Sequence, residues 1–388
     1  MSVYMDAAAT SRPYQEVVDA MMPYLTEQYF NPSSLYSNGV KVKNAIDDAR
    51  KTVGDFINAK ANEIYFTSGG SESNCWAIRG FVDEVRCRCG KSVVITSQIE
   101  HKSIMECVKS VNCLDTETWY IGVDNFGYID VKQLIYKIER ATNNGIRPKN
   151  ILVSIQLANN EVGTIQDIRK ISSIVHGYGC VLHVDAVQAF GQIKIDVKDM
   201  GIDMLSASAH KIGACKGTGI LYKNDDIDIK PIIFGSQMNG MRGGTENVAG
   251  IVGMAKAVEI AHYNMMRSSE LSIKRDYLIM MLRRIGCRLN GAVLSNRLPN
   301  NVNVILPNGV GAEEMLYMLD LSDIMVSTGS ACNSRMKKPS HVLMAMGLTE
   351  DEAARSIRLT LNRDTTYDDI DECVNEISNA IKLINSVG

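Results

Sequence analysis

The chain has 388 residues, of which 45% are apolar and 22% are charged, as is usual for a soluble globular protein. One hydrophobic core rarely serves more than about 300 residues, so we expect two domains. The formal net charge of -3 gives no electrostatic basis for direct binding to nucleic acid. No run of about 18 apolar residues occurs and no basic start precedes an apolar stretch, so neither a membrane span nor a signal peptide is expected.

The ten cysteines are scattered along the chain, too thinly for a disulfide scaffold. Cys87 and Cys89 form a C-x-C pair, but no second pair at metal-ligand spacing accompanies them, so no metal site is expected. Free thiols in a reducing cytoplasm fit this distribution.

The first part of the chain predicts an irregular arm over 1–13, helices over 14–27 and 39–58, and then an alternation of strands and helices. Strands are expected over 64–67, 92–96, 116–121, 151–155, 180–184, 204–208 and 219–222. Further helices are expected through Trp76 to Val85 and over 101–111, 131–141 and 168–178. This alternation is typical of an α/β fold with a mostly parallel sheet covered on both faces.

The second part of the chain changes pattern after a long helical segment expected over 248–286. Strands over 302–306 and 356–361 and helices over 312–319 and 367–386 predict a small α+β unit. We expect a large domain over 14–257 and a small domain formed by 1–13 and 258–388. A loop at about 326–339, rich in small and basic residues, is expected on the surface of the small domain.

Four polar residues fall at the C-terminal ends of the predicted strands, where ligands collect in such folds: His101, Asn160, Asp185 and Lys211. An acid and a lysine at neighbouring strand ends suit an enzyme that holds a pyridinium ring and forms an imine with its aldehyde. Taken alone, Asp185 and Lys211 are as readily ordinary surface residues. The convergence of all four residues favours a cofactor site.

A small-residue loop after the strand at 64–67 predicts an anion site. Gly69, Gly70 and Ser71 lead into a helix, where glycines allow close approach and free N–H groups point at a ligand. Ser71 alone would be read as a helix N-cap. The loop has neither the G-x-G-x-x-G of dinucleotide-binding folds nor the G-K-[ST] of a P-loop.

Ten segments in order resemble the class V aminotransferases, which are pyridoxal-phosphate enzymes, and among them the NifS-type (group I) cysteine desulfurases. The segments are D-A-A-A-T (6–10), N-P-S-S (31–34), T-S-G-G-S-E-S-N (67–74), E-H-K (100–102), N-N-E-V-G (159–163), H-V-D-A-V-Q (183–188), S-A-H-K (208–211), R-G-G-T (242–245), S-T-G-S-A-C (327–332) and S-I-R-L-T-L-N-R (356–363). The resemblance covers essentially the whole chain. It implies the fold type I of pyridoxal-phosphate-dependent transferases, with a seven-stranded, mostly parallel sheet between helices and a small α+β domain.

The resemblance implies catalytic roles for four residues. Lys211 would form the imine with pyridoxal 5'-phosphate, Asp185 would pair with the pyridinium nitrogen, and His101 would stack on the ring and move protons. Cys332 would be the nucleophile that takes sulfur. By default Cys332 is one more thiol, but its loop has the small residues that let a thiol travel and two lysines that favour the thiolate.

The resemblance also implies binding roles. Asn160 and Gln188 would contact the phenolic-oxygen side of the cofactor ring, and Asn31 and Arg358 would bind the substrate carboxylate, which a guanidinium group suits. Thr245 would reach the phosphate in a neighbouring subunit, so a homodimer is implied. The cofactor phosphate within the subunit would be held by Gly70, Ser71, Ser208 and His210.

The implied reaction converts L-cysteine to L-alanine and leaves a persulfide on Cys332, from which sulfur passes to an acceptor protein. The acceptor would serve Fe–S cluster assembly, tRNA thiolation or DNA phosphorothioation. A selenocysteine lyase or an aminotransferase of the same family is the alternative. A catalytically weak scaffold that binds a sulfur acceptor is a third reading, and the presence of Lys211, Asp185, His101 and Cys332 argues against it.

Several positions depart from the family pattern without removing a catalytic group. Cys215 replaces a proline close to Lys211 and Met238 stands in an altered G-S-Q-M segment, while Ala7 and Asn362 replace a common Asn and Gly. Histidines without a motif are expected to be structural: His176, His183, His262 and His341.

Overall fold

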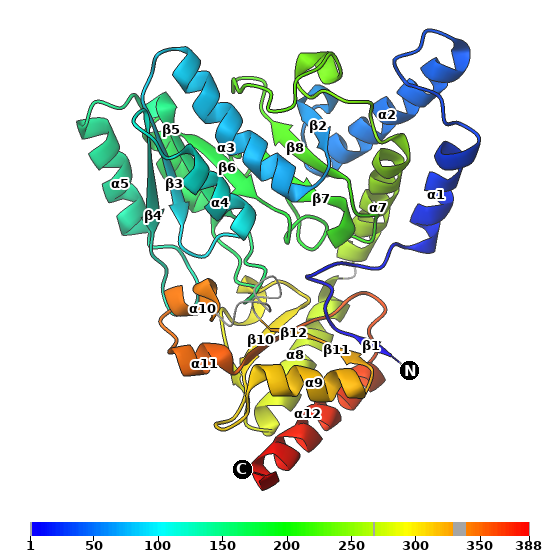
Figure 1. The fold of residues 1–388 in the computed structure, drawn as a ribbon, viewed down its shortest axis with the longest axis vertical. Coiled ribbons are helices and arrows are strands. Elements are labelled where there is room, and N and C mark those ends of the chain that lie inside the picture. Colours follow the sequence, from blue (N-terminus) through cyan, green and yellow to red (C-terminus); the bar gives the residue numbers. More distant parts are fainter. Residues whose placement is uncertain (1, 267, 329–338, 388) are drawn as a thin grey trace.

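The computed structural model describes residues 2–266, 268–328 and 339–387, which form two units (Figure 1). The large unit, at the top of Figure 1, contains a broad sheet with helices α1 to α7. The small unit, below it, contains the other sheets and helices α8 to α12. Strand β1, near the N-terminus, belongs to the small unit although α1, which follows it, belongs to the large one.

The sheet of the large unit has seven strands among the described residues, in the order β2-β8-β7-β6-β5-β3-β4. Strand β8 runs antiparallel to both of its neighbours, and the remaining pairs are parallel, so the predicted mostly parallel sheet is confirmed. Strand β6 begins one residue later than predicted and ends on Asp185 itself. The strands are β2 (Ile64–Thr67), β3 (Ser92–Ser97), β4 (Thr116–Ile121), β5 (Ile151–Gln156), β6 (Val181–Asp185), β7 (Met204–Ser208) and β8 (Gly219–Lys223).

Helices cover both faces of this sheet because its strands are apolar on both sides. Val93 and Ile95 of β3 pack toward the layer of α2, α5, α6 and α7, whereas Val94 packs toward α3 and α4. No helix in the described part of the chain is long and apolar enough to cross a membrane. The helices are α1 (Gln15–Thr26), α2 (Ser37–Phe56), α3 (Gly70–Cys87), α4 (Lys102–Val111), α5 (Val131–Asn143), α6 (Ile168–Gly177) and α7 (Val248–Met266).

The small unit has its own core around an antiparallel sheet in the order β12-β13-β10-β9. The helical segment predicted over 248–286 consists of α7 and α8. The predicted domain boundary at 257/258 falls inside α7 and stays a prediction. The elements of the small unit are β1 (Val3–Tyr4), α8 (Ser268–Arg284), β9 (Arg288–Leu289), β10 (Asn301–Ile305), α9 (Ala312–Leu321), β11 (Ile324–Met325), β12 (Ser327–Thr328), α10 (His341–Ala345), α11 (Glu350–Ala354), β13 (Ser356–Thr360) and α12 (Tyr367–Val387).

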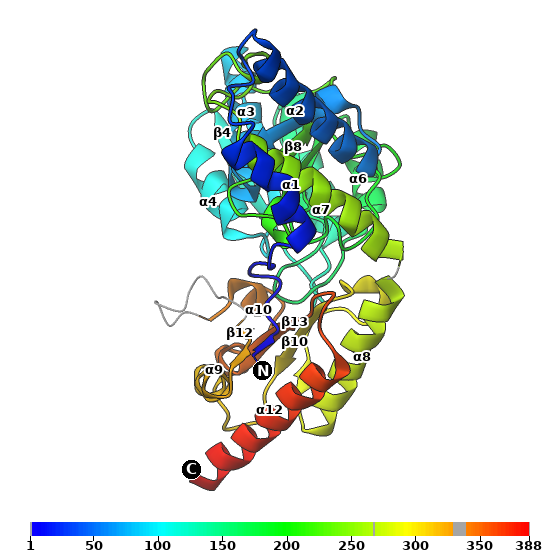
Figure 2. The ribbon, with the colours of Figure 1, turned by 90° about the vertical axis from the view of Figure 1, so that its right-hand side faces the viewer.

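Residues 2–13, here called the N-terminal arm, connect the two units (Figures 1 and 2). The arm begins with β1, which pairs in parallel with β11. It then passes the loop after β7, where the backbone N–H of Ser11 donates to the carbonyl of His210 at 2.9 Å. The arm therefore lies beside the segment that carries Lys211.

Candidate functional site

A cavity of about 290 Å³ lies at the C-terminal ends of β5, β6 and β7. Its wall combines the large unit with the N-terminal arm, α10 and β13 of the small unit. Ten of the residues predicted from the sequence line it: Gly70, Ser71, His101, Asn160, Asp185, Gln188, Ser208, His210, Lys211 and Arg358. The structure thus brings together residues from segments almost 290 positions apart in the chain.

Asp185 presents a buried carboxylate to this cavity from the last position of β6, with only 5% of its surface exposed. The side-chain amide of Asn74 donates to one of its oxygens at 2.8 Å, and the backbone N–H of Val187 donates to the other at 2.9 Å. Burial raises the pKa of Asp185, and positive charge on a protonated His101, the hydrogen bonds from Val187 and Asn74, and the charge of Lys211 oppose that rise. A cationic ring nitrogen bound here would stabilise the carboxylate further.

Lys211 follows β7 after one short helical turn and points toward the N-terminal arm. Its Nζ donates to the carbonyl oxygens of Ala8 and Ala9, at 2.5 and 2.7 Å. Gln188 Nε2 donates to the same carbonyl of Ala8 at 3.1 Å. The two predicted residues Lys211 and Gln188 are therefore both oriented by one backbone segment from the small unit.

His101 is the N-cap of α4, and this position fixes its ring. Its Nδ1 accepts from the backbone N–H of Ser103 at 3.1 Å and lies 2.8 Å from the Ser103 hydroxyl. Burial lowers the pKa of His101, which favours the neutral ring. Because Nδ1 accepts a hydrogen bond from Ser103, the neutral ring carries its proton on Nε2. Asn74 Nδ2 lies 3.0 Å from Ser103 Oγ, which links His101 to Asp185 through Asn74 and Ser103. Asn74 is the last residue of the T-S-G-G-S-E-S-N segment. Its place in this motif is the signal from which a role in the site could have been predicted.

The loop before α3 has the geometry of an anion cradle. Gly69 has a φ of +151°, which favours glycine, and a Cβ on Gly70 would lie 2.5 Å from a methyl carbon of Val187. The backbone at these two glycines therefore lies closer to the cavity than a residue with a side chain would allow. The N–H groups at the start of α3, together with the side chains of Ser71 and Ser208, fit a phosphate group.

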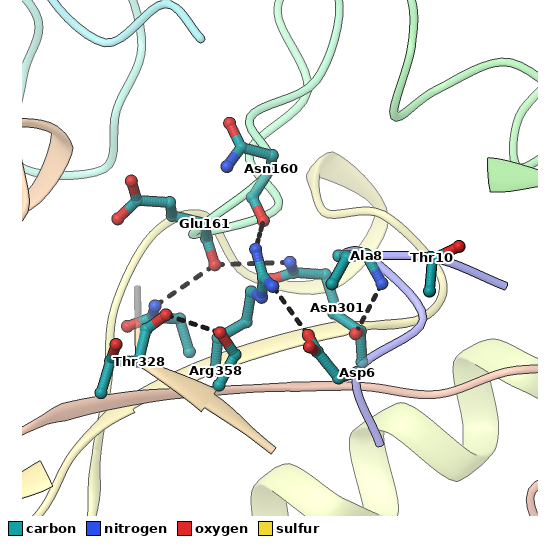
Figure 3. Close-up of polar contacts among 12 residues, drawn as sticks. Asp6, Ala8, Thr10, Asn160, Glu161, Asn301, Thr328 and Arg358 are labelled. Carbon is teal, nitrogen blue, oxygen red and sulfur yellow. Dashed lines mark hydrogen bonds and ion pairs between the residues drawn. The ribbon is translucent and has the colours of Figure 1, made fainter. Parts of the chain in front are cut away.

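Arg358 enters the cavity wall from β13 of the small unit (Figure 3). Its Nη1 donates to the carbonyl of Asn160 at 2.9 Å, and its Nη2 forms an ion pair with Asp6 at 2.7 Å. A guanidinium group placed at the edge of an amino-acid site can bind a carboxylate.

Three predicted site residues are not among the described residues that line this cavity. Asn31 and Thr245 are exposed and do not line it, so their roles stay predictions. Cys332 lies outside the described residues, as do the small residues and lysines around it in 329–338. Of the departures from the family pattern, Cys215 is partly buried against the large core, and its thiol lies 3.5 Å from the sulfur of Met21.

The sequence did not single out two buried carboxyl groups next to the cavity. Glu100 accepts from the Ser97 hydroxyl at 2.5 Å, and burial raises its pKa to about 8. Glu161 accepts from the Ser340 hydroxyl at 2.5 Å, and burial raises its pKa to about 7. His341, expected to be structural, lines the cavity, and its Nε2 lies 2.9 Å from the carbonyl of Glu100.

Replacing Glu100 by glutamine should flatten the pH dependence of stability. Native Glu100 keeps its proton up to about pH 8, whereas in the unfolded chain it ionises near the ordinary glutamate pKa of 4.5. The native state therefore binds more protons in that window, and the free energy of unfolding falls as pH rises through it, by about 1.4 kcal/mol per pH unit. Glutamine has no such proton, so between pH 6.5 and 8 the variant should lose roughly 2 kcal/mol less than the wild type.

Urea denaturation at three pH values in this window measures the difference. Burial lowers the pKa values of His183 and His210 to about 3 and about 4. These histidines make the free energy of unfolding rise with pH, but only below about pH 6.5. Glu106→Gln, at an exposed position of α4, is the control and should leave the slope unchanged. Parallel slopes for wild type and Glu100→Gln would contradict the prediction.

Comparison with known proteins identifies the family. Residues 3–373 match the family model "Aminotransferase class-V". The cysteine desulfurase IscS of Clostridium botulinum (strain Hall) is 42% identical over 385 residues, which is 98% of this chain and 94% of that protein. A solved structure of a NifS-like protein superposes with a TM-score of 0.89 at 32% identity, covering 99% of this chain and 100% of that one. The structure of SspA in complex with cysteine has a TM-score of 0.79 at 33% identity over 93% of this chain and 99% of that one. The chain belongs to the class-V aminotransferase family.

Proposed function

We propose that this protein is a pyridoxal-phosphate-dependent cysteine desulfurase. The observation that carries the proposal is one cavity that joins Lys211, the buried Asp185, an anion cradle and Arg358. These are the groups needed to hold an aromatic cofactor by both ends and an amino acid by its carboxylate. The full-length relative named cysteine desulfurase supports the same reaction.

The described residues fit the cofactor. The start of α3 with Ser71 and Ser208 would hold its phosphate, Asp185 would face its ring nitrogen, and Lys211 would reach its aldehyde. Asn160 and Gln188 would contact the phenolic-oxygen side, and His210 would join the phosphate contacts. When bound, pyridoxal phosphate supplies a ring that accepts electrons and makes the Cα proton of the substrate acidic.

Four side chains of the protein have separate roles in the reaction. Arg358 would orient the substrate carboxylate, Lys211 would remove the Cα proton as a base, and His101, with its proton on Nε2, would donate or accept protons during the reaction. Cys332 attacks the substrate sulfur as a thiolate. The sum is L-cysteine plus the Cys332 thiol giving L-alanine plus a Cys332 persulfide, in which an S–S bond replaces the C–S bond of the substrate.

The partners of this reaction complete the proposal. A homodimer in which Thr245 reaches the phosphate of the other subunit agrees with the exposure of Thr245. The Cys332 persulfide passes its sulfur to an acceptor protein for Fe–S cluster assembly, tRNA thiolation or DNA phosphorothioation. We place the enzyme in the cytoplasm, where free thiols persist, and expect no direct contact with nucleic acid.

One incubation tests the proposal. The purified protein, loaded with pyridoxal phosphate, is mixed with L-cysteine and dithiothreitol, and sulfide and alanine are measured. Equal amounts of both products are expected. A keto acid instead of alanine would identify an aminotransferase, and turnover confined to L-selenocysteine would identify a selenocysteine lyase. Either result would overturn the assignment.

A further inference from the structure

The guanidinium group of Arg358 already has an anionic partner. Asp6 forms an ion pair with Nη2 (Figure 3), and only 4% of the Arg358 side chain and 18% of the Asp6 side chain are exposed. Nη1 donates to the carbonyl of Asn160, and Nε is buried without a hydrogen-bond partner among the described residues. An incoming carboxylate must therefore bind the remaining N–H groups beside Asp6.

Backbone pairing with β13 sets the position of Asp6. Asp6 forms an isolated parallel bridge with Thr360 of β13, whose backbone N–H donates to the carbonyl of Met5 at 2.7 Å. The backbone N–H of Ala8 donates to the Thr360 hydroxyl at 2.9 Å. Residues 358 and 360 project from the same face of the strand because they are two positions apart. Pairing of the arm with β13 thus places the Asp6 carboxylate next to Arg358.

A bound amino acid and Asp6 would place two carboxylates on the single guanidinium group of Arg358. Two carboxylates that share a guanidinium group lie within about 4–6 Å of each other, where like charges disfavour each other. The shielding by water is weak here, since both side chains are largely buried. Asp6 must therefore weaken the binding of any carboxylate at Arg358.

We propose that Asp6 is a positioning residue that competes with the amino-acid carboxylate for Arg358 and so limits the affinity for substrate and product alike. The ion pair holds the guanidinium in place while no amino acid is bound, and the repulsion favours the release of alanine after each turnover. This inference rests on the proposed function in that Arg358 is taken to bind the substrate carboxylate.

The test is Asp6→Asn in the holoenzyme, which removes the charge and keeps an oxygen acceptor for Arg358. L-Alanine and cysteamine, an amine and thiol without a carboxylate, are titrated by calorimetry. The variant should bind L-alanine about tenfold more tightly than the wild type, with the affinity for cysteamine unchanged. The KM for L-cysteine should fall in the same proportion. Unchanged or weaker binding of L-alanine would overturn the proposal, as would an equal change for both ligands.

Two further variants separate charge from structure. Tyr4→Phe removes the hydroxyl contacts to the carbonyls of Asp6 and Thr10, at 3.0 and 2.6 Å, and leaves the Asp6 carboxylate in place. Its affinity for L-alanine should equal that of the wild type, and tighter binding would assign the effect to a loosened arm and overturn the proposal. Asp6→Ser is the second charge-removing variant, to be used if Asp6→Asn does not fold, with the same expected result. A wild type that releases no sulfide from cysteine would refute the proposed function, while the alanine and cysteamine titrations would still report on Asp6.

Discussion

Replacing Lys211 by alanine should reduce sulfide release from L-cysteine by at least about 10³-fold. Lys211 is the lysine whose Nζ contacts the arm at Ala8 and Ala9 inside the cavity that holds Asp185. Its loss would remove both the covalent attachment point of the cofactor and the base for the Cα proton. Reduction with borohydride followed by peptide mass spectrometry should find the pyridoxyl group on residue 211 in the wild type only.

Lys216 provides the matched control for this variant. It lies five positions further along the same loop and is exposed. Lys216→Ala removes an equal charge close to the site and should keep near wild-type turnover. Full activity in Lys211→Ala, or a pyridoxyl group at another lysine in the wild type, would show that the imine is formed elsewhere.

Replacing Cys332 by serine should abolish sulfide release while leaving the cofactor bound. Serine lacks the polarisable thiolate that attacks sulfur and cannot carry a persulfide. The groups proposed to hold the cofactor, Lys211 and Asp185 among them, are unchanged, so the visible absorption of the holoenzyme should be retained. Sulfide assays with dithiothreitol and absorption spectra measure the two effects.

Cys215→Ser is the control for the loss of a thiol near the site. The Cys215 thiol contacts Met21 and packs against the core of the large unit, so it is expected to serve packing and not sulfur transfer. Cys215→Ser should desulfurate cysteine at close to the wild-type rate. The opposite pattern, an active Cys332→Ser and an inactive Cys215→Ser, would move the nucleophile to Cys215.

The sequence predicted those parts of the site that depend on local pattern. Apolar strands followed by polar residues are visible in a sequence, and the ends of parallel strands must meet at one edge of the sheet. Asp185, Lys211 and the start of α3 were found for that reason. The family resemblance added Arg358, which no local pattern distinguishes from a surface residue on a strand.

The parts that the sequence did not reveal depend on contacts between distant segments. The ion pair of Asp6 with Arg358 joins residues 352 positions apart, and Ser340 contacts Glu161 across 179 positions. Glu100 has the appearance of an ordinary polar residue in the sequence, and its complete burial in the fold is the main cause of its raised pKa. Asn31 and Thr245 do not line the cavity, so their roles stay predictions.

The N-terminal arm has a consequence for how the protein is made. Strand β1 pairs with residues 324–325, and Asp6 bridges Thr360, so this part of the arm is synthesised more than 300 positions before the segments with which it pairs. The seven-stranded sheet can form earlier, because all of its strands precede residue 224. The wall of the cavity also needs His341 of α10 and Arg358 of β13, which lie beyond the sheet in the sequence. A nascent chain that ends just after the complete sheet therefore still lacks a finished catalytic cavity, and chemistry can begin only after β13 has been synthesised.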